Sequence, residues 1–343
     1  MARILIIRFS ALGDVAMTVP VVYSLATQYP QHEIVVLSRA VMQPLFQELP
    51  SNVQFWGVRL EDYKGFGGLN RFYSELKAKR FDYVADFHNV IRTKYLCLRF
   101  RLSGIPVASI CKGRAGKQKL VRRFHKILEP QKNSFQRYAD VLSALGFSVG
   151  LEFSSIYGQG KGDFTQIKSV TGIKENQKWV GIAPFAKHKG KIYPLELQEQ
   201  VVAHFAVNPE VKVFLFGGGK EEEEVFNRWT VKYPTIVSLI GKLNMQTELD
   251  LMSHLDVMVS MDSANMHLAS LVNIPVVSVW GATHPYAGFM GWRQLPENTV
   301  QAEISCRPCS VYGQKPCFRK DYACLTMITP MQVIEKIEKI IGK

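Results

Sequence analysis

Short apolar runs that alternate with helix-like stretches are the feature that most constrains how this chain can fold. They form two series, and both are rich in β-branched or continuously apolar residues, as expected of parallel strands buried on both faces. The segments between the runs have helical periodicity. The runs lie at 3–9, 33–39, 83–88 and 107–110, and then at 179–185, 211–219, 235–241, 256–262 and 274–281. Two successive βα series predict two doubly wound, Rossmann-like α/β domains.

The boundary between the two domains is predicted in the polar, glycine-bearing segment 157–166, which gives domains at 1–160 and 161–343 of the 343-residue chain. In open parallel sheets, ligands bind outside the carboxyl ends of the strands. The informative residues are therefore those that directly follow each strand. If the two domains face one another, these two rims of residues would line a common cleft.

The charge balance favours an anionic partner. The chain has 42 Lys and Arg against 29 Asp and Glu, a net charge of +13. The stretch 111–126 carries bases and no acid, so it is either a solvated loop and helix face or an anion site. The apolar run near the start is too short for a signal peptide, and no run of 18 apolar residues suggests a membrane span. A cytoplasmic location is the default expectation.

The stretch 260–285 carries the strongest candidate site. A strand ends there, and Asp262, Ser263 and Ala264 open a helix whose free backbone N–H groups could bind a diphosphate. His267 lies one turn further, on roughly the face of Ser263. The simpler alternatives are that Asp262 or Ser263 only caps the helix and that His267 is a core histidine.

Two loops add candidates for the same ligand. Lys187 and Lys191 crowd the loop after the strand at 179–185 and could neutralise a diphosphate leaving group, unless the loop is simply solvated. A glycine-rich turn at 217–219 permits close backbone approach, and Glu221 just beyond it could bind ribose hydroxyls. The alternative for this acidic run is a favourable first turn of a helix.

Five stretches together carry a resemblance to a known family. They are RFSALGDVAMTVP at the N-terminus, DYVADFHNVIRT (82–93), KIYP (191–194), GKLNMQTELDLMSHLDVMVSMDSANMHLA (241–269) and IPVVSVWGATHP (274–285). The chain resembles glycosyltransferase family 9, the lipopolysaccharide heptosyltransferases. The resemblance implies two Rossmann-like domains in the GT-B arrangement, with an ADP-sugar donor bound by the second domain. It also implies inverting, metal-independent transfer of a heptose or related sugar, and the sequence contains no Asp-x-Asp.

The resemblance also gives roles to single residues. It implies that Asp14, which follows Gly13 at the end of the first strand, is the catalytic base; the alternative is that Asp14 caps its own helix. The acceptor is expected to be an anionic lipid A-type or inner-core glycolipid at the inner face of the inner membrane. Its predicted contacts are Ser10, His88, Arg92, Thr93, Arg122 and Arg123. The chain departs from the family pattern at Ala264, where the family usually has glycine, and at His88.

Four cysteines near the C-terminus have the spacing C-x2-C-x7-C-x6-C. They are either the ligands of a structural zinc ion or simple reduced thiols: Cys306, Cys309, Cys317 and Cys324. Two other functions use the same observations. One is an epimerase-like enzyme that acts on nucleotide sugars with this fold. The other is a basic nucleic-acid-binding protein, against which stand the absence of a recognition helix, of an RNP pattern and of aromatic residues interleaved in the basic run.

Overall fold

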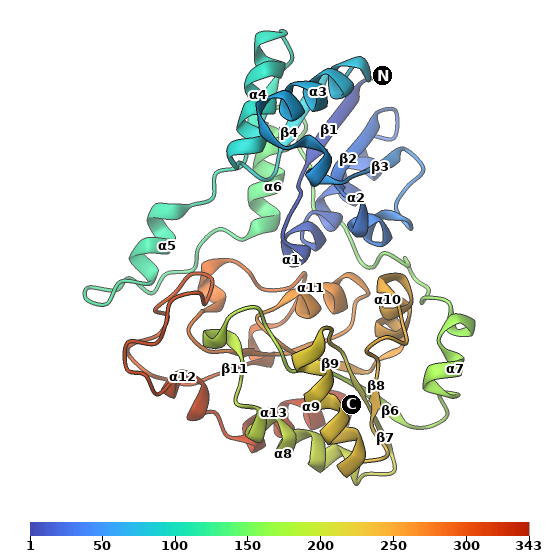
Figure 1. Ribbon diagram of the computed structural model, residues 1–343, viewed down its shortest axis with the longest axis vertical. Coiled ribbons are helices and arrows are strands. Elements are labelled where there is room, and N and C mark those ends of the chain that lie inside the picture. Colours follow the sequence, from blue (N-terminus) through green and yellow to red (C-terminus); the bar gives the residue numbers. More distant parts are fainter. Residues whose placement is uncertain (343) are drawn as a thin grey trace. The chain divides into compact units, whose positions relative to one another are not determined.

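The computed structural model describes residues 1–342, and its contacts divide the chain into two compact units. The first unit consists of Met1–Lys112 and Asn133–Ile156. The second consists of Gly113–Lys132 and the chain from Tyr157 on. Each unit contains one wholly parallel sheet (Figure 1). The prediction of two doubly wound α/β domains is confirmed.

The first unit is built on a five-stranded sheet of order β3-β2-β1-β4-β5. Its strands are β1 (Arg3–Ile7), β2 (Glu33–Arg39), β3 (Val53–Val58), β4 (Tyr83–Asp86) and β5 (Val107–Ser109). On one face, Leu5 and Ile7 pack with Phe72 of α3 and Phe100 of α4. The other face is covered by α2 and α6. The helices are α1 (Leu12–Ala16), α2 (Val19–Gln28), α3 (Gly65–Ala78), α4 (Ile91–Leu102) and α6 (Ser134–Ser143), with 3-10 turns η1 (Ala40–Phe46) and η2 (Leu60–Tyr63).

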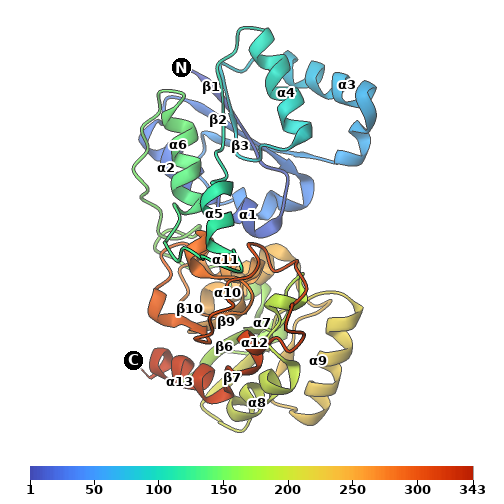
Figure 2. The same cartoon turned by 90° about the vertical axis from the view of Figure 1, so that its left-hand side faces the viewer.

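The second unit has a six-stranded sheet of order β11-β10-β9-β6-β7-β8. Its strands are β6 (Lys178–Ala183), β7 (Val211–Leu215), β8 (Val237–Ser238), β9 (Val257–Met261), β10 (Val276–Trp280) and β11 (Thr299–Gln301). Figure 2 shows α8 and α13 on one side of these strands, and α10 and α11 on the other. The longer helices are α8 (Leu195–Ala206), α9 (Lys220–Lys232), α10 (Met245–His254), α11 (Ala264–Leu271) and α13 (Pro330–Ile341). Shorter ones are α5 (Arg114–Leu120), η3 (Phe164–Gln166), α7 (Lys168–Thr171), η4 (Lys189–Lys191), η5 (Pro285–Ala287), η6 (Pro296–Asn298) and α12 (Ala323–Thr326).

Nine of the strands lie where the apolar runs predict them, and two edge strands were missed. β3 reads VQFWGV and is buried fully only at Val58, because it forms an edge of its sheet. β11 has three residues and forms an edge of the other sheet. Neither VQFWGV nor TVQ forms a continuous apolar run, whereas the runs at 107–110 and 235–241 marked the edge strands β5 and β8. The C-terminal helix α13 begins as expected, with the Thr329 hydroxyl accepting the Gln332 N–H.

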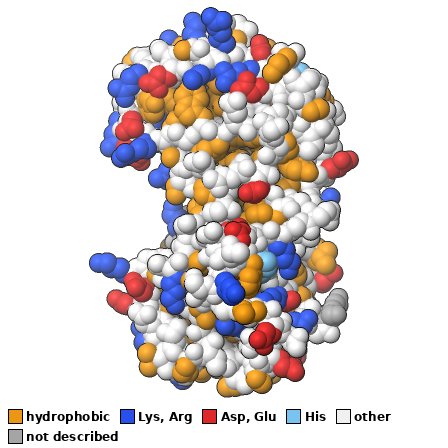
Figure 3. All heavy atoms as spheres, turned by 90° about the vertical axis from the view of Figure 1, so that its right-hand side faces the viewer, with side chains coloured by type: hydrophobic (Ala, Val, Ile, Leu, Met, Phe, Trp, Pro, Cys, Tyr) orange, Lys and Arg blue, Asp and Glu red, His pale blue; other side chains and the backbone are white. Residues whose placement is uncertain are grey.

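One face of the molecule carries charged side chains of both signs. On the face in Figure 3, Asp and Glu side chains lie among Lys and Arg side chains, with hydrophobic side chains between them. Within residues 1–342, none of the helices combines the length and the apolarity that a membrane crossing requires.

Candidate active site

The candidate base lies at the carboxyl edge of the first sheet. Strands β1 and β4 pair in parallel, with Ile7 beside Asp86, so the chain leaves both strands at the same edge. After β1 it passes through Ser10 into the short helix α1, and after β4 it passes through His88 into α4. These two turns bring His88 to the same rim as Ser10 and Asp14, although it is far from both in the sequence.

Asp14 is held by a buried arginine. The Arg8 Nη2 atom lies 2.6 Å from Asp14 Oδ2, and the backbone N–H of Ala11 donates to the same oxygen at 3.2 Å. The Arg8 side chain is almost fully buried, whereas a third of the Asp14 side chain is exposed. Arg8 also donates from Nη1 to the Phe87 carbonyl at 2.7 Å, which ties the β1 turn to the β4 turn. Asp14 therefore does not cap α1 from the N-cap position; it bonds back to that position from the third residue of the helix.

His88 lies beside this ion pair and is uncharged at neutral pH. Burial, together with the Arg8 and Lys112 cations, lowers the pKa of His88 to about 4, against an opposing effect of Asp14. The Phe9 N–H donates to Nδ1 at 3.4 Å, so the neutral ring carries its proton on Nε2. Nε2 lies 3.4 Å from the Ser10 hydroxyl. Two of the predicted acceptor residues, Ser10 and His88, therefore contact each other near Asp14.

The other two predicted contacts on α4 differ in access. Thr93 is fully buried, and its hydroxyl donates to Asp86 Oδ2 at 2.9 Å and accepts the Val90 N–H. Its observed bonds fix the start of α4. Arg92 is partly exposed and donates to the Leu60 carbonyl at 3.1 Å, so it remains accessible to a ligand.

In the second unit, the predicted donor residues meet at the carboxyl ends of β6 and β9, which pair in parallel. Lys191 Nζ lies 2.9 Å from Asp262 Oδ2, and both side chains are largely buried. Asp262 and Ser263 follow β9, and α11 begins at Ala264 without a side-chain cap. The Ser263 hydroxyl lies 3.1 Å from that of Ser260 instead. The first N–H groups of α11 are therefore not satisfied by the side chain before the helix, and a lysine lies beside Asp262 just before it.

The remaining predicted donor residues have different surroundings. His267 is buried one turn into α11, and Ala264 is half-buried at its start. Lys187 and Glu221 are exposed. It is the next residue, Glu222, that accepts the Gly218 N–H at 2.8 Å and holds the glycine-rich turn.

Arg8 was missed by the sequence reasoning, and Glu222 was interpreted only as part of an acidic first turn of a helix. The signal for Arg8 was present, since a charged residue directly follows an apolar strand in the letters ILIIRFS (residues 4–10). No pattern distinguished Glu222 from its acidic neighbours.

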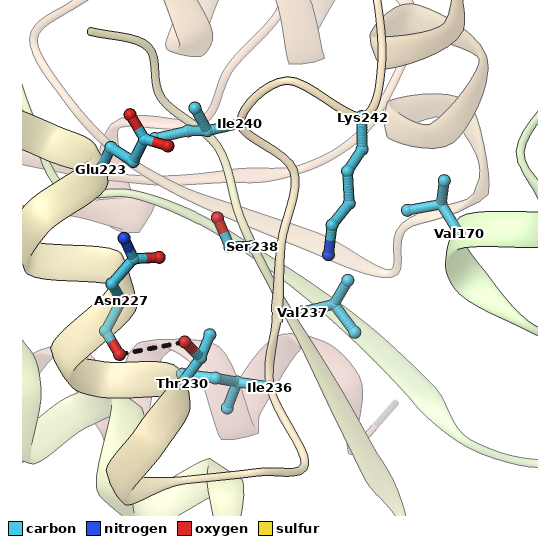
Figure 4. A pocket seen from close by; sticks show the side chains of 9 residues that line it. All are labelled: Val170, Glu223, Asn227, Thr230, Ile236, Val237, Ser238, Ile240 and Lys242. Atoms are coloured by element: carbon cyan, nitrogen blue, oxygen red, sulfur yellow. Dashed lines mark hydrogen bonds between the residues drawn. The ribbon is translucent and has the colours of Figure 1, made fainter. Parts of the chain in front are cut away.

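A hollow of about 390 Å³ lies elsewhere in the second unit, beside the edge strand β8. Figure 4 shows Glu223 and Asn227 of α9 on one side of it, and Lys242 and Val170 across from them. None of the predicted donor residues lines this hollow. Helix α9, which carries Glu221, lines part of this hollow, but the hollow is separate from the surface formed by Lys191 and Asp262.

Arg122 and Arg123 lie in a segment that belongs to the second unit. The sequence boundaries assigned residues 113–132 to the first domain, but their contacts group them with the second. The Gln131 N–H donates to the Tyr286 carbonyl at 2.8 Å, and Lys126 Nζ donates to the Cys306 carbonyl at 2.9 Å. The two arginines therefore do not share a unit with Ser10, His88 and Arg92.

The four C-terminal cysteines lie in a loop that packs on the turn after β10. Arg307, which is buried, donates to the Gly281 and Thr283 carbonyls, both at 2.9 Å. All four cysteines are free thiols: Cys306, Cys309, Cys317 and Cys324. In the part of the chain described, no three His, Cys, Asp or Glu side chains come together as metal ligands. A structural zinc ion at these cysteines stays a prediction.

Comparison with known proteins decides the family. The model of glycosyltransferase family 9 (heptosyltransferase) matches residues 69–317, which is most of the chain. The chain belongs to glycosyltransferase family 9. It is therefore a glycosyltransferase, as the sequence resemblance implied.

Relatives of this family member span its whole length. Lipooligosaccharide heptosyltransferase 2 of Campylobacter jejuni is 23% identical over 342 residues and covers 96% of both chains. A family 9 glycosyltransferase from Veillonella parvula has a TM-score of 0.74 at 18% identity, over 99% of this chain and 97% of that one. The Escherichia coli heptosyltransferase WaaC with ADP-2-deoxy-2-fluoro heptose has a TM-score of 0.69 at 17% identity, over 98% and 99%. At such identities the solved structures establish the fold of this family 9 chain.

Proposed function

We propose that this protein is an inverting, metal-independent heptosyltransferase that moves a heptose from ADP-heptose to a lipopolysaccharide inner-core acceptor. The family and the heptosyltransferase relatives support the sugar and the acceptor class. The WaaC structure with an ADP-heptose analogue supports the nucleotide. The observation that carries the chemistry is the Asp14 carboxylate, which is partly exposed at a strand end and fixed there by the buried Arg8.

Asp14 is the proposed base. Inverting transfer is a single displacement, in which the acceptor hydroxyl loses its proton as it attacks the anomeric carbon. Both interactions of the Asp14 carboxylate described above are made by Oδ2, which leaves Oδ1 to accept that proton. Arg8 fixes the orientation of the carboxylate, and the neutral His88 with Ser10 supplies hydrogen-bonding groups for the acceptor sugar.

In this proposal, residues of the second unit stabilise the leaving ADP. Negative charge develops on the diphosphate as the glycosidic bond breaks, and donors already aimed at that charge lower the barrier. Lys191 and the first N–H groups of α11 are such donors. Because Lys191 is paired with Asp262 before the donor binds, we expect it to exchange this carboxylate for a phosphate oxygen. The sequence has no Asp-x-Asp to hold a divalent ion beside the diphosphate, and we propose that Lys191 supplies the positive charge instead.

A nucleotide panel tests the donor half of the proposal. ADP, UDP, GDP and CMP are added to the protein, and the melting temperature is followed. Ligand at about 100 times its dissociation constant adds about 2.7 kcal/mol to the free energy of unfolding. We expect ADP alone to give this shift, and Lys191→Ala to reduce it to about 1.4 kcal/mol or less at the same ADP concentration. Equal shifts by UDP or GDP would contradict the choice of ADP.

Product analysis tests the reaction itself. With ADP-heptose carrying a labelled sugar, the label should appear on the glycolipid acceptor with inverted anomeric configuration, and the rate should not fall when a chelator is present. Label recovered as a free or epimerised nucleotide sugar would contradict transfer, and loss of rate with the chelator would contradict metal independence.

A further inference from the structure

Two segments of the second unit expose bases and large hydrophobic side chains together. In 119–128, Phe124 is 71% exposed and Leu128 54%, beside the exposed Arg122 and Arg123. In 312–320, Phe318 is 50% exposed, and bases flank it. We call these two segments together the basic–aromatic surface. Its exposed bases are Lys119, Arg122, Arg123, Lys315, Arg319 and Lys320.

The two segments are held against each other by specific contacts. The Arg123 guanidinium lies over the ring of Phe318 at 4.7 Å and over that of Phe124 at 5.4 Å. Lys126 Nζ donates to the carbonyls of Ser305 at 3.2 Å and of Cys306 at 2.9 Å. The surface is therefore assembled by the fold of the second unit, and Figure 1 shows α5 and the loop after it standing out from the body of that unit.

The composition of this surface points to an anionic bilayer. Exposed apolar residues that gather in one place, among bases, are typical of surfaces that lie in the headgroup region of a membrane. Ile127 and Leu128 are aliphatic, so they cannot stack on nucleobases as aromatic side chains do. Contact with lipid acyl chains would instead remove their apolar surface from water. Neither 119–128 nor 312–320 contains an acid; Glu129 directly follows the first segment, and Asp321 directly follows the second, where it is paired with Arg319 at 2.9 Å.

We propose that the basic–aromatic surface docks the protein on a bilayer of anionic phospholipids. The proposal rests on the proposed function, because a glycolipid acceptor must be reached at a membrane. It changes the role of Arg122 and Arg123, from contacts with the acceptor sugar to contacts with lipid headgroups. Docking needs neither donor nor acceptor, so it can be measured apart from transfer.

Vesicle sedimentation tests the proposal, with the full chain and vesicles that contain no acceptor. One set is phosphatidylcholine alone, and the other is phosphatidylcholine with phosphatidylglycerol in equal parts. We expect binding to the anionic vesicles only. Arg122→Gln with Arg123→Gln should weaken it about 30-fold, since each base near an anionic surface contributes about fivefold. Phe124→Ser with Phe318→Ser should weaken it about tenfold, which corresponds to the loss of about 30 Å² of buried apolar area per ring.

Matched controls carry the same changes away from the surface. Lys168→Gln with Arg228→Gln removes two exposed bases of the second unit, and Phe66→Ser with Val231→Ser removes two exposed apolar side chains. Equal weakening by these controls, or equal binding to neutral vesicles, would overturn the proposal. The proposal would also be overturned if heparin or RNA abolished vesicle binding and the Phe124→Ser, Phe318→Ser variant bound vesicles as well as the parent. That combination would identify a general polyanion site.

A second measurement distinguishes whether Arg122 and Arg123 bind lipid headgroups or the acceptor. The acceptor is dispersed in neutral detergent and its KM is determined for the arginine double variant. A raised KM together with unchanged vesicle binding would assign the arginines to the acceptor and refute docking. Failure of the protein to transfer heptose at all, with vesicle binding still dependent on these arginines, would contradict the proposed function and leave docking intact.

Discussion

Replacing Asp14 by Asn tests whether the carboxylate at the end of β1 is the base. Asn keeps the size of the side chain and can still accept the Ala11 N–H, but it cannot take a proton. Removal of a general base lowers a rate by about 10²–10⁴-fold. We therefore expect kcat to fall by that factor, while ADP still binds, because Lys191 and α11 are unaltered.

The structure also predicts a stability cost for this variant. Arg8 is almost fully buried, and its ion pair with Asp14 is 2.6 Å long. Removing one partner of a buried pair costs about 3–5 kcal/mol, and the exposure of a third of the Asp14 side chain reduces this to about 2 kcal/mol. Urea unfolding of the two proteins measures this difference.

The matched control is Arg8→Gln, which breaks the same ion pair and leaves the carboxylate in place. The rates are measured with saturating ADP-heptose and acceptor, under conditions in which both variants are folded. If Asp14 is the base, Arg8→Gln should retain much more of kcat than Asp14→Asn. Full turnover by Asp14→Asn would refute the assignment, and equal rate losses in the two variants would show that the ion pair, and not proton transfer, carries the effect.

Three further predictions concern the second unit. Lys191→Ala should weaken ADP binding at least about tenfold by titration calorimetry and leave Asp262 without its cation, whereas Lys191→Arg should retain most of the affinity. Burial raises the pKa of Glu248 to about 7, so ionisation opposes folding progressively between pH 4.5 and 7. Glu248→Gln should then be more stable than the parent by about 3 kcal/mol at pH 8, and equally stable at pH 4, in urea unfolding. If the four C-terminal cysteines hold a structural zinc ion, elemental analysis should find about one zinc per chain, and Cys306→Ser should lose it; purified protein without zinc would leave these cysteines as reduced thiols.

The parts of the fold that could be predicted are those in which local pattern and burial coincide. Central strands such as β1 and β9 are buried on both faces, so their apolar runs indicated strands without ambiguity. The edge strands β3 and β11 form no continuous apolar run, so nothing local separated them from loops. Once the strands were predicted, the residues of the rim could be predicted as well, because in a parallel sheet the residues that follow the strands all lie at its carboxyl end.

The chemistry of the rim could be predicted only in part. Lys191 was found because its residue type and its place after a strand suit diphosphate binding, whereas the role of Asp14 as a base came from the family resemblance. Their partners Arg8 and Asp262 depend on distances across the fold, which spacing along the chain does not give. Asp14 illustrates the difference. A cap and a base were weighed as alternatives from sequence, whereas the structure has an ion pair with a buried arginine, which fits the role of an oriented base.

The segment 113–132 marks the limit of sequence reasoning most clearly. The chain leaves the first unit after Lys112, contributes α5 and its loop to the second unit, and returns at Asn133. A pattern of strands and helices assigns such a segment to the domain that surrounds it in the sequence. Only contacts between residues distant in the sequence, such as Lys126 with Cys306, show that it packs on the other unit. The consequence is functional as well as topological. The most basic stretch of the chain is joined to the unit of Lys191 and Asp262, so the attraction of an anionic surface acts directly on the unit proposed to hold the donor. Acceptor recognition is then left to the rim around Asp14, His88 and Arg92, and kinetics in detergent and binding to vesicles should respond to different substitutions.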